Sequence, residues 1–94
     1  MLFALYCVDK AGAGQVRLDN RAAHLQHLQA HMAQIRFAGP LTSDDGAAMQ
    51  GSLLLMDFPD RAAAETFAKG DPYAKAGLFA EVRITAVKQV LPKA

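Results

Sequence analysis

Hydrophobic positions along the chain predict four extended segments. Residues 2–8 and 51–58 are apolar on both faces of a strand, which is typical of strands covered on both sides. Residues 79–91 alternate between apolar and polar positions, as a strand with one buried face does. A shorter extended piece is predicted at 37–41, where Pro40 lacks a backbone N–H and therefore suits an edge, a bulge or a strand start.

The longest helical pattern follows the first strand. It begins either near Val16 or at an Asn20 cap, and it continues to Arg36. Apolar side chains recur at helical spacing at Leu25, Leu28, Met32 and Ile35. We therefore predict an amphipathic helix that buries this stripe.

The second helix has clear signals at both ends. Asp60 is a good N-cap for a helix over residues 61–69, and Gly70 stands where a glycine commonly ends a helix. Asp71 and Pro72 then predict a short further turn, with aspartate as the cap and proline at the first helical position.

The elements follow the order strand, helix, strand, strand, helix, strand. This βαββαβ order is that of the ferredoxin-like fold, an α+β architecture with a four-stranded antiparallel sheet and two helices on one face. We expect residues 1–94 to form a single domain, since no interior linker interrupts them. The exposed sheet face would be apolar in places, so two copies are predicted to pair these faces as a homodimer, a dimeric α/β barrel with pockets between sheet and helices.

Composition and charge exclude several classes of function. The net charge is +1 and the basic residues are scattered, which argues against a nucleic-acid partner. The apolar run at 1–8 is too short for a membrane span or a signal sequence, and a single cysteine, Cys7, fits a reducing compartment. We therefore predict a cytoplasmic protein with no membrane partner. The pair Gly12 and Gly14 lacks the further glycine and the lysine of phosphate-binding loops, and no cofactor is expected.

The first predicted helix carries all three histidines of the chain. On a helical wheel His24 lies at the edge of the apolar stripe, His31 lies a little further out, and His27 points towards solvent. Arg21 falls inside the stripe, where its charge must reach solvent along its alkyl chain or meet a buried anion. His24 is therefore the histidine best placed to line a pocket, with Arg21 as the anion-binding group beside it. The alternative is an edge histidine with a structural hydrogen bond and a surface arginine.

Two further sets of residues leave alternatives open. Asp71 is explained as a helix cap, but a capping carboxylate also orients an imidazole when the two lie close together. The hydroxyl groups of Tyr6 and Ser52 lie on strands and either reach a pocket or are packed or solvated. The three histidines could share a metal ion at helical spacing, but His27 points away and no fourth ligand is near in sequence, so we predict no metal site.

Several segments of the chain, in this order, resemble the YCII-related (YciI-like) family. They are Tyr6-Cys7-Val8-Asp9-Lys10, Arg17 to Leu25, Ala38-Gly39-Pro40, Gly51-Ser52 and Asp71 to Phe79. The resemblance implies a ferredoxin-like fold, a dimeric α/β barrel and an active site with a His–Asp dyad, which here would be His24 and Asp71. Ala22 stands where relatives often have proline. Most members have no established reaction, and one known activity is dehydrochlorination of a chlorinated hydroxyhydroquinone.

Two functions follow from these observations. In the first, the chain is a small enzyme of the lyase, isomerase or hydrolase type, in which His24 moves a proton and Asp71 orients it. Arg21 would hold an anionic oxygen of a small anionic or aromatic metabolite, and Ser52, Tyr6 and Pro40 would line the pocket. In the second, the chain is a non-catalytic dimer that binds a small acidic molecule or acts as an accessory protein.

Overall fold

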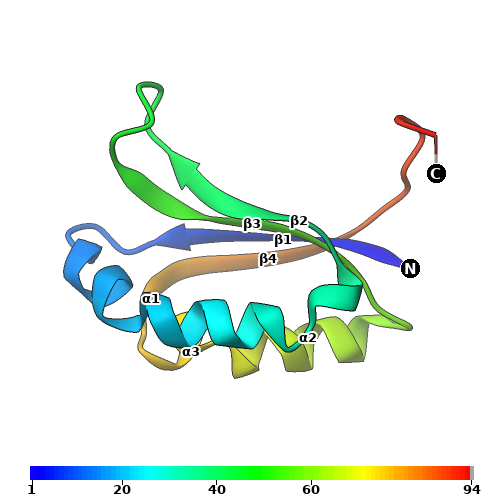
Figure 1. The fold of residues 1–94 in the computed structure, drawn as a ribbon, viewed down its shortest axis with the longest axis horizontal. Helices are drawn as coiled ribbons and strands as arrows, with labels where there is room; N and C mark the ends of the chain where they lie inside the picture. The colour runs from blue at the N-terminus through cyan, green and yellow to red at the C-terminus, as the bar shows by residue number, and fades with distance from the viewer. Residues whose placement is uncertain (94) are drawn as a thin grey trace.

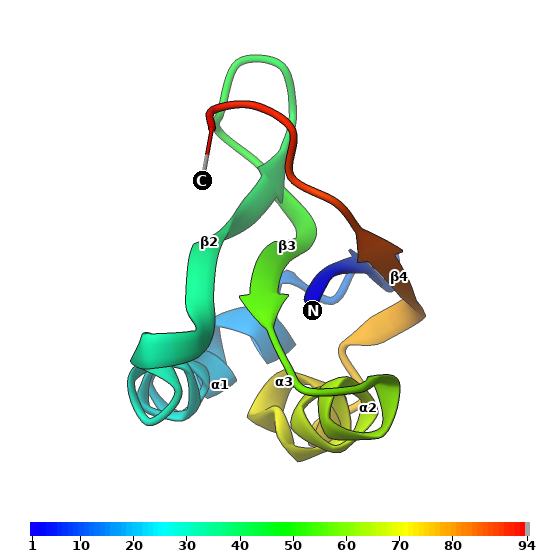
Figure 2. The same ribbon diagram turned by 90° about the vertical axis from the view of Figure 1, so that its right-hand side faces the viewer.

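The computed structural model, which describes residues 1–93, has the predicted ferredoxin-like architecture. A four-stranded sheet in the order β2-β3-β1-β4 has antiparallel neighbours throughout. The helices cover one face of this sheet, as both views show (Figures 1 and 2). In chain order the elements are β1 (Leu2–Asp9), α1 (Gly14–Gln29), a short 3₁₀ turn (Met32–Gln34), β2 (Ile35–Thr42), β3 (Met49–Asp57), α2 (Arg61–Gly70), α3 (Pro72–Lys75) and β4 (Phe79–Val87).

The central strand β1 divides its side chains between two environments. Phe3, Leu5 and Cys7 face the helices and are almost completely buried, whereas Tyr6 on the other face is 41% exposed. The core under the helices consists of Phe3, Leu5, Leu28, Leu54, Met56, Phe58, Ala64 and Phe67. Since successive strand residues alternate between faces, the sheet has one face covered by helices and one open face.

The observed bounds of the first helix, α1, differ from those predicted from the sequence. It begins at Gly14, directly after a turn in which Gly12 has a positive φ, and no side chain caps it. It ends at Gln29, so the predicted continuation to Arg36 is wrong. Ile35 belongs to β2, where it pairs with Met56, and Met32 lies in the intervening turn and is 59% exposed. The helical spacing of these two residues was coincidental, because the chain must reverse before it can enter the sheet.

The last strand is shorter than its alternating pattern predicts. The register pairs Val87 of β4 with Leu2, the first residue of β1, so a longer β4 would have no neighbouring strand to bond. Residues 88–93 therefore leave the sheet on the side away from the helices (Figure 1). Within the described residues, no helix is both long and apolar enough to cross a membrane.

β1 and β3 approach each other closely at Gly51. A Cβ atom at this position would collide with the carbonyl oxygen of Cys7. Gly51 is itself buried, and the next residue, Ser52, pairs with Cys7 in the register. The glycine thus permits the close approach of the two strands next to Ser52, a buried polar residue that lines the cavity described below.

Candidate active site

A cavity of about 140 Å³ lies between α1, strands β2 and β3, and the short helix α3. One wall is polar and comes from Arg17, Arg21, His24, Ser52 and Tyr73. The remaining wall is formed by small or apolar residues, namely Leu25, Leu28, Ala38, Gly39, Pro40, Met49 and Leu54. The cavity therefore combines an apolar surface with a few convergent polar groups, as small-molecule sites do.

His24 and Asp71 meet at the cavity wall although 47 positions separate them in sequence. Nδ1 of His24 lies 2.9 Å from Oδ1 and 3.0 Å from Oδ2 of Asp71, and both side chains are buried. A carboxylate only accepts hydrogen bonds, so Nδ1 carries a proton and donates a hydrogen bond to Asp71. Nε2 is then the nitrogen that remains available to a ligand.

Asp71 also caps α3, so the two roles that the sequence left open are filled together. Oδ1 of Asp71 accepts a hydrogen bond from the backbone N–H of Tyr73 at 2.9 Å. One carboxylate therefore fixes the start of a short helix and the orientation of an imidazole. The capping signal in the sequence was correct, but it identified only half of this residue's contacts.

Tyr73 is a site residue that sequence reasoning missed. Its ring stacks on the His24 imidazole, with a centroid separation of 4.0 Å and an interplanar angle of 15°. Burial raises the pKa of the Tyr73 hydroxyl above its ordinary value, and the charges of Arg17 and Arg21 oppose this change. The phenol is therefore neutral near pH 7, and its ring fixes the plane of the histidine.

Arg17 was also missed, although it lines the cavity and is hydrogen-bonded to both Asp9 and Ser52. Its Nε and Nη2 donate to the two carboxylate oxygens of Asp9 at 2.7 and 2.9 Å, and Nη2 also donates to Ser52 Oγ at 3.0 Å. Burial opposes its charge, but the hydrogen bond and charge of Asp9 outweigh this and raise the pKa of the guanidinium. Its spacing from Arg21 and His24, at four and seven residues, was the available signal, but it required the true helix start.

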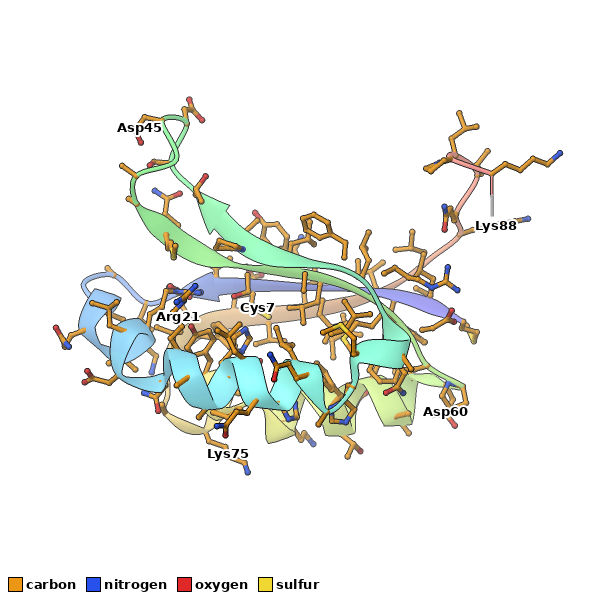
Figure 3. The ribbon with its side chains drawn as sticks, in the orientation of Figure 1. Cys7, Arg21, Asp45, Asp60, Lys75 and Lys88 are labelled. Carbon is orange, nitrogen blue, oxygen red and sulfur yellow. The ribbon has the colours of Figure 1, made fainter. Side chains whose placement is uncertain are left out.

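The other predicted site residues divide into those the fold brings to the cavity and one that it does not. Ser52 and Pro40 line the cavity, and Arg21 lies at its more exposed side, on the face of α1 towards the sheet (Figure 3). Tyr6 does not line it. The side chain of Tyr6 points to the open face of the sheet, because it lies between Leu5 and Cys7, which both point to the helices.

The two remaining histidines lie beyond the cavity, towards α2. His27 is not the solvent-directed residue that the wheel predicted: its Nε2 donates to the carbonyl oxygen of Phe67 at 3.1 Å, and the two rings stack at 4.5 Å. His31 donates from Nδ1 to the carbonyl oxygen of His27. In residues 1–93 no group of three or more histidine, cysteine, aspartate or glutamate side chains is arranged to hold a metal ion.

The sequence family is decided by a match that covers nearly the whole chain. The family described as the YCII-related domain matches residues 1–88. The chain belongs to the YCII-related family. Protein YciI of Escherichia coli is 37% identical over 97 residues, which cover 96% of this chain and 99% of the relative. An uncharacterized protein of Haemophilus influenzae is 31% identical over the same coverage.

One of the solved structures to which the YCII-related chain is similar is an enzyme. The 5-chloro-2-hydroxyhydroquinone dehydrochlorinase TftG of Burkholderia phenoliruptrix, in complex with 2,5-dihydroxybenzoquinone, is similar with 40% identity and a TM-score of 0.87, over 94% of each chain. Rv0793 of Mycobacterium tuberculosis is 15% identical with a TM-score of 0.56 over 99% of this chain and 97% of the other, which shows a shared fold alone.

Proposed function

We propose that this chain is a small enzyme that uses His24 and Asp71 for acid–base chemistry on a small anionic or aromatic metabolite. The observation that carries the proposal is the buried hydrogen bond between Nδ1 of His24 and Asp71 at the wall of a cavity. The reaction would be of the lyase, isomerase or hydrolase type. The similarity to a dehydrochlorinase supports an elimination among these.

The proton would move through the free nitrogen of His24. Nδ1–H is hydrogen-bonded to Asp71, so Nε2 would take a proton from a ligand held in the cavity. The carboxylate would stabilise the imidazolium that forms. The same nitrogen then returns the proton to the product or to water. Arg21 would hold the oxygen on which negative charge develops, since it lines the cavity close to His24 along α1.

The size of the cavity limits the ligand to roughly one ring. An engineered cavity of about 150 Å³ in another protein holds benzene, and the cavity here measures about 140 Å³. The volume therefore matches a single six-membered ring with a few oxygen substituents. The 2,5-dihydroxybenzoquinone bound by TftG belongs to this single-ring class, which supports the proposal.

The activity test begins with 5-chloro-2-hydroxyhydroquinone and a panel of hydroxylated single-ring compounds, with chloride release and absorbance as readouts. His24→Ala should reduce turnover by about 10²–10⁴-fold, the usual contribution of a general acid or base. His31→Ala is the matched control, since His31 lies outside the cavity and should leave turnover unchanged. Equal turnover in the wild type and His24→Ala would contradict the proposal.

Asp71 needs a control of its own because it also caps a helix. Asp60 caps α2 by accepting from Ala63 N at 2.9 Å, but it has no histidine partner. Asparagine caps a helix about as well as aspartate, so neither Asp71→Asn nor Asp60→Asn should disturb its helix much. Asp71→Asn should nevertheless lower turnover strongly, because it removes the charge beside His24, whereas Asp60→Asn should leave turnover unchanged. Tight ligand binding by a wild type that turns over no compound of the panel would favour the alternative, a non-catalytic binding protein.

A homodimer through the open face of the sheet is the second part of the proposal. This face presents Phe37, which is 51% exposed, and Tyr6 beside the partly buried Leu53 and Leu55. An apolar sheet face of this kind is typical of an interface. Phe37→Asp should convert a dimer to a monomer in sedimentation equilibrium, while Leu18→Asp on exposed α1 should not. A monomeric wild type at all concentrations would exclude the dimer.

A further inference from the structure

Ser52 has a hydroxyl group whose hydrogen-bonding capacity is only partly used. Its Oγ accepts a hydrogen bond from Nη2 of Arg17 at 3.0 Å. A serine hydroxyl has one O–H to donate in addition to its acceptor lone pairs. Within residues 1–93 no acceptor takes this O–H, although Ser52 is 3% exposed and lines the cavity. The free donor is therefore available to a ligand.

The ion pair with Asp9 fixes the orientation of the Arg17 guanidinium, which donates a hydrogen bond to Ser52. Its fork binds both carboxylate oxygens of Asp9, and the ion pair is buried on both sides. One hydrogen of Nη2 is used by Asp9, and the other is left for Ser52. Because the guanidinium has no acceptor capacity, Ser52 cannot donate back to it. The donor direction between these two residues is thus settled by chemistry.

Arg17 also contacts the ring that packs on the histidine. Its guanidinium carbon lies 4.7 Å from the centroid of the Tyr73 ring, and that ring is stacked on His24. A single buried arginine therefore touches two neighbours that each border the ligand space. Arg17 itself is only 6% exposed and its charge is already paired with Asp9.

We propose that Arg17 is a positioning residue that makes the Ser52 hydroxyl a hydrogen-bond donor to an oxygen of the ligand and keeps the Tyr73 ring against His24. The proposal rests on the proposed function, and it adds a requirement to it. The ligand must present a carbonyl, phenolate or carboxylate oxygen to Ser52 while another of its groups faces His24. Arg21 and Ser52 then recognise oxygens of the ligand, while Arg17 borders the cavity with its charge already paired with Asp9 and acts through its neighbours.

A double-mutant cycle between Arg17 and Ser52 tests this, with 2,5-dihydroxybenzoquinone as the probe and calorimetry as the readout. Ser52→Ala should weaken binding roughly 10–100-fold, the value of a hydrogen bond to a charged oxygen. Arg17→Lys keeps a positive charge for Asp9 but lacks the planar fork, so it should weaken binding to a similar degree. Arg17→Lys in the Ser52→Ala background should weaken binding less than Arg17→Lys does alone, because the part of its effect that passes through Ser52 is already lost.

Additive effects of the two changes would overturn the proposal, because Arg17 would then not act through Ser52. Wild-type affinity in folded Arg17→Lys would overturn it as well. Arg36→Lys is the matched control: Arg36 pairs with Asp57 at 2.6 Å on the surface, away from the cavity, and its change should leave affinity unaltered. If Arg17→Lys does not fold, the neutral pair Asp9→Asn/Arg17→Gln replaces it in the same cycle.

A second measurement separates this proposal from the proposed function. If the wild type binds no hydroxyquinone or phenolate, the ligand class proposed above is wrong, and Arg17 is judged in the ligand-free protein. Nuclear magnetic resonance of the ring signals of His24 should then show a shift in Arg17→Lys, because the Tyr73 ring loses the guanidinium it contacts. Unchanged His24 signals would contradict the positioning role of Arg17 even without a ligand.

Discussion

His24 and His27 lie one turn apart on α1, yet their hydrogen-bond partners and their surroundings differ. His24 donates to the carboxylate of Asp71 and lines the cavity. His27 donates to the carbonyl oxygen of Phe67 and packs on its ring. His24 stacks on Tyr73 and lines the same cavity as Arg17 and Ser52, whereas Phe67, the partner of His27, packs against Phe58 and His31 in the apolar core.

The difference lies in what each partner can do for a charged imidazole. A carboxylate stabilises the imidazolium form by its charge, so a histidine beside it can accept and return a proton. A backbone carbonyl fixes the orientation of the ring but supplies no full charge. The same residue type on the same helix therefore has a charged partner at one position and a packing partner at the other, and the proposed function assigns the proton transfer to the first.

Phe67→Ala should have the largest effect on stability and none on the site. Phe67 is 5% exposed and contacts two histidines and Phe58, so its truncation should lower the free energy of unfolding by about 3–5 kcal/mol, measured by urea denaturation. The affinity of the folded fraction for 2,5-dihydroxybenzoquinone should be unchanged.

The control for this change is Leu18→Ala. Leu18 lies on α1 and is 67% exposed, so its truncation should lower the free energy of unfolding by less than about 0.5 kcal/mol. A loss of ligand affinity in Phe67→Ala that parallels the loss of stability would show that the two ends of the layer are coupled, and the comparison drawn above would fail.

A smaller effect is expected at Cys7, a buried thiol on β1 that pairs in register with the cavity residue Ser52. Burial, with the nearby charges of Asp71 and Asp9, raises the pKa of this thiol from 9.0 to about 12. Since the folded state holds the proton more tightly than the unfolded state, its contribution to stability is complete below pH 9 and is lost as the pH rises towards 12. By about pH 10 the loss should be about 1 kcal/mol in the wild type.

Cys7→Ala removes this titrating group and should therefore lose less stability between about pH 8 and about pH 10 than the wild type, by denaturation at each pH. Other alkaline groups are common to both proteins and cancel in the comparison. Identical pH dependence in the two proteins would mean that the thiol is not held in this buried, negatively charged surrounding.

The sequence was most informative where a local pattern has a single structural meaning. The order of apolar segments gave the βαββαβ architecture, which the structure confirms. The capping signals at Asp60 and Asp71 marked the starts of α2 and α3, since a side-chain cap satisfies backbone N–H groups in its own neighbourhood. The match to the YCII-related family agrees with the resemblance read from short motifs.

The sequence was least informative where contacts are distant along the chain. The stripe predicted on α1 included Met32 and Ile35, because periodicity does not reveal where a chain must turn into a sheet. The wheel placed His27 towards solvent, because a wheel contains no information about a second helix such as α2. Tyr6 was assigned to the pocket as a hydroxyl-bearing residue on a strand, whereas the alternation of β1 turns it to the open face.

By itself, then, the amino-acid sequence determined the kinds and order of elements, because hydrophobic spacing and caps act over a few residues. Only the tertiary structure decided the composition of the site. Arg17, Ser52 and Tyr73 converge on one cavity from α1, β3 and α3, and Asp9 of β1 holds Arg17 from behind. Asp71 reaches His24 across 47 positions. Such contacts depend on how the helices pack on the sheet, and that packing minimises the free energy of the whole chain rather than of any one segment.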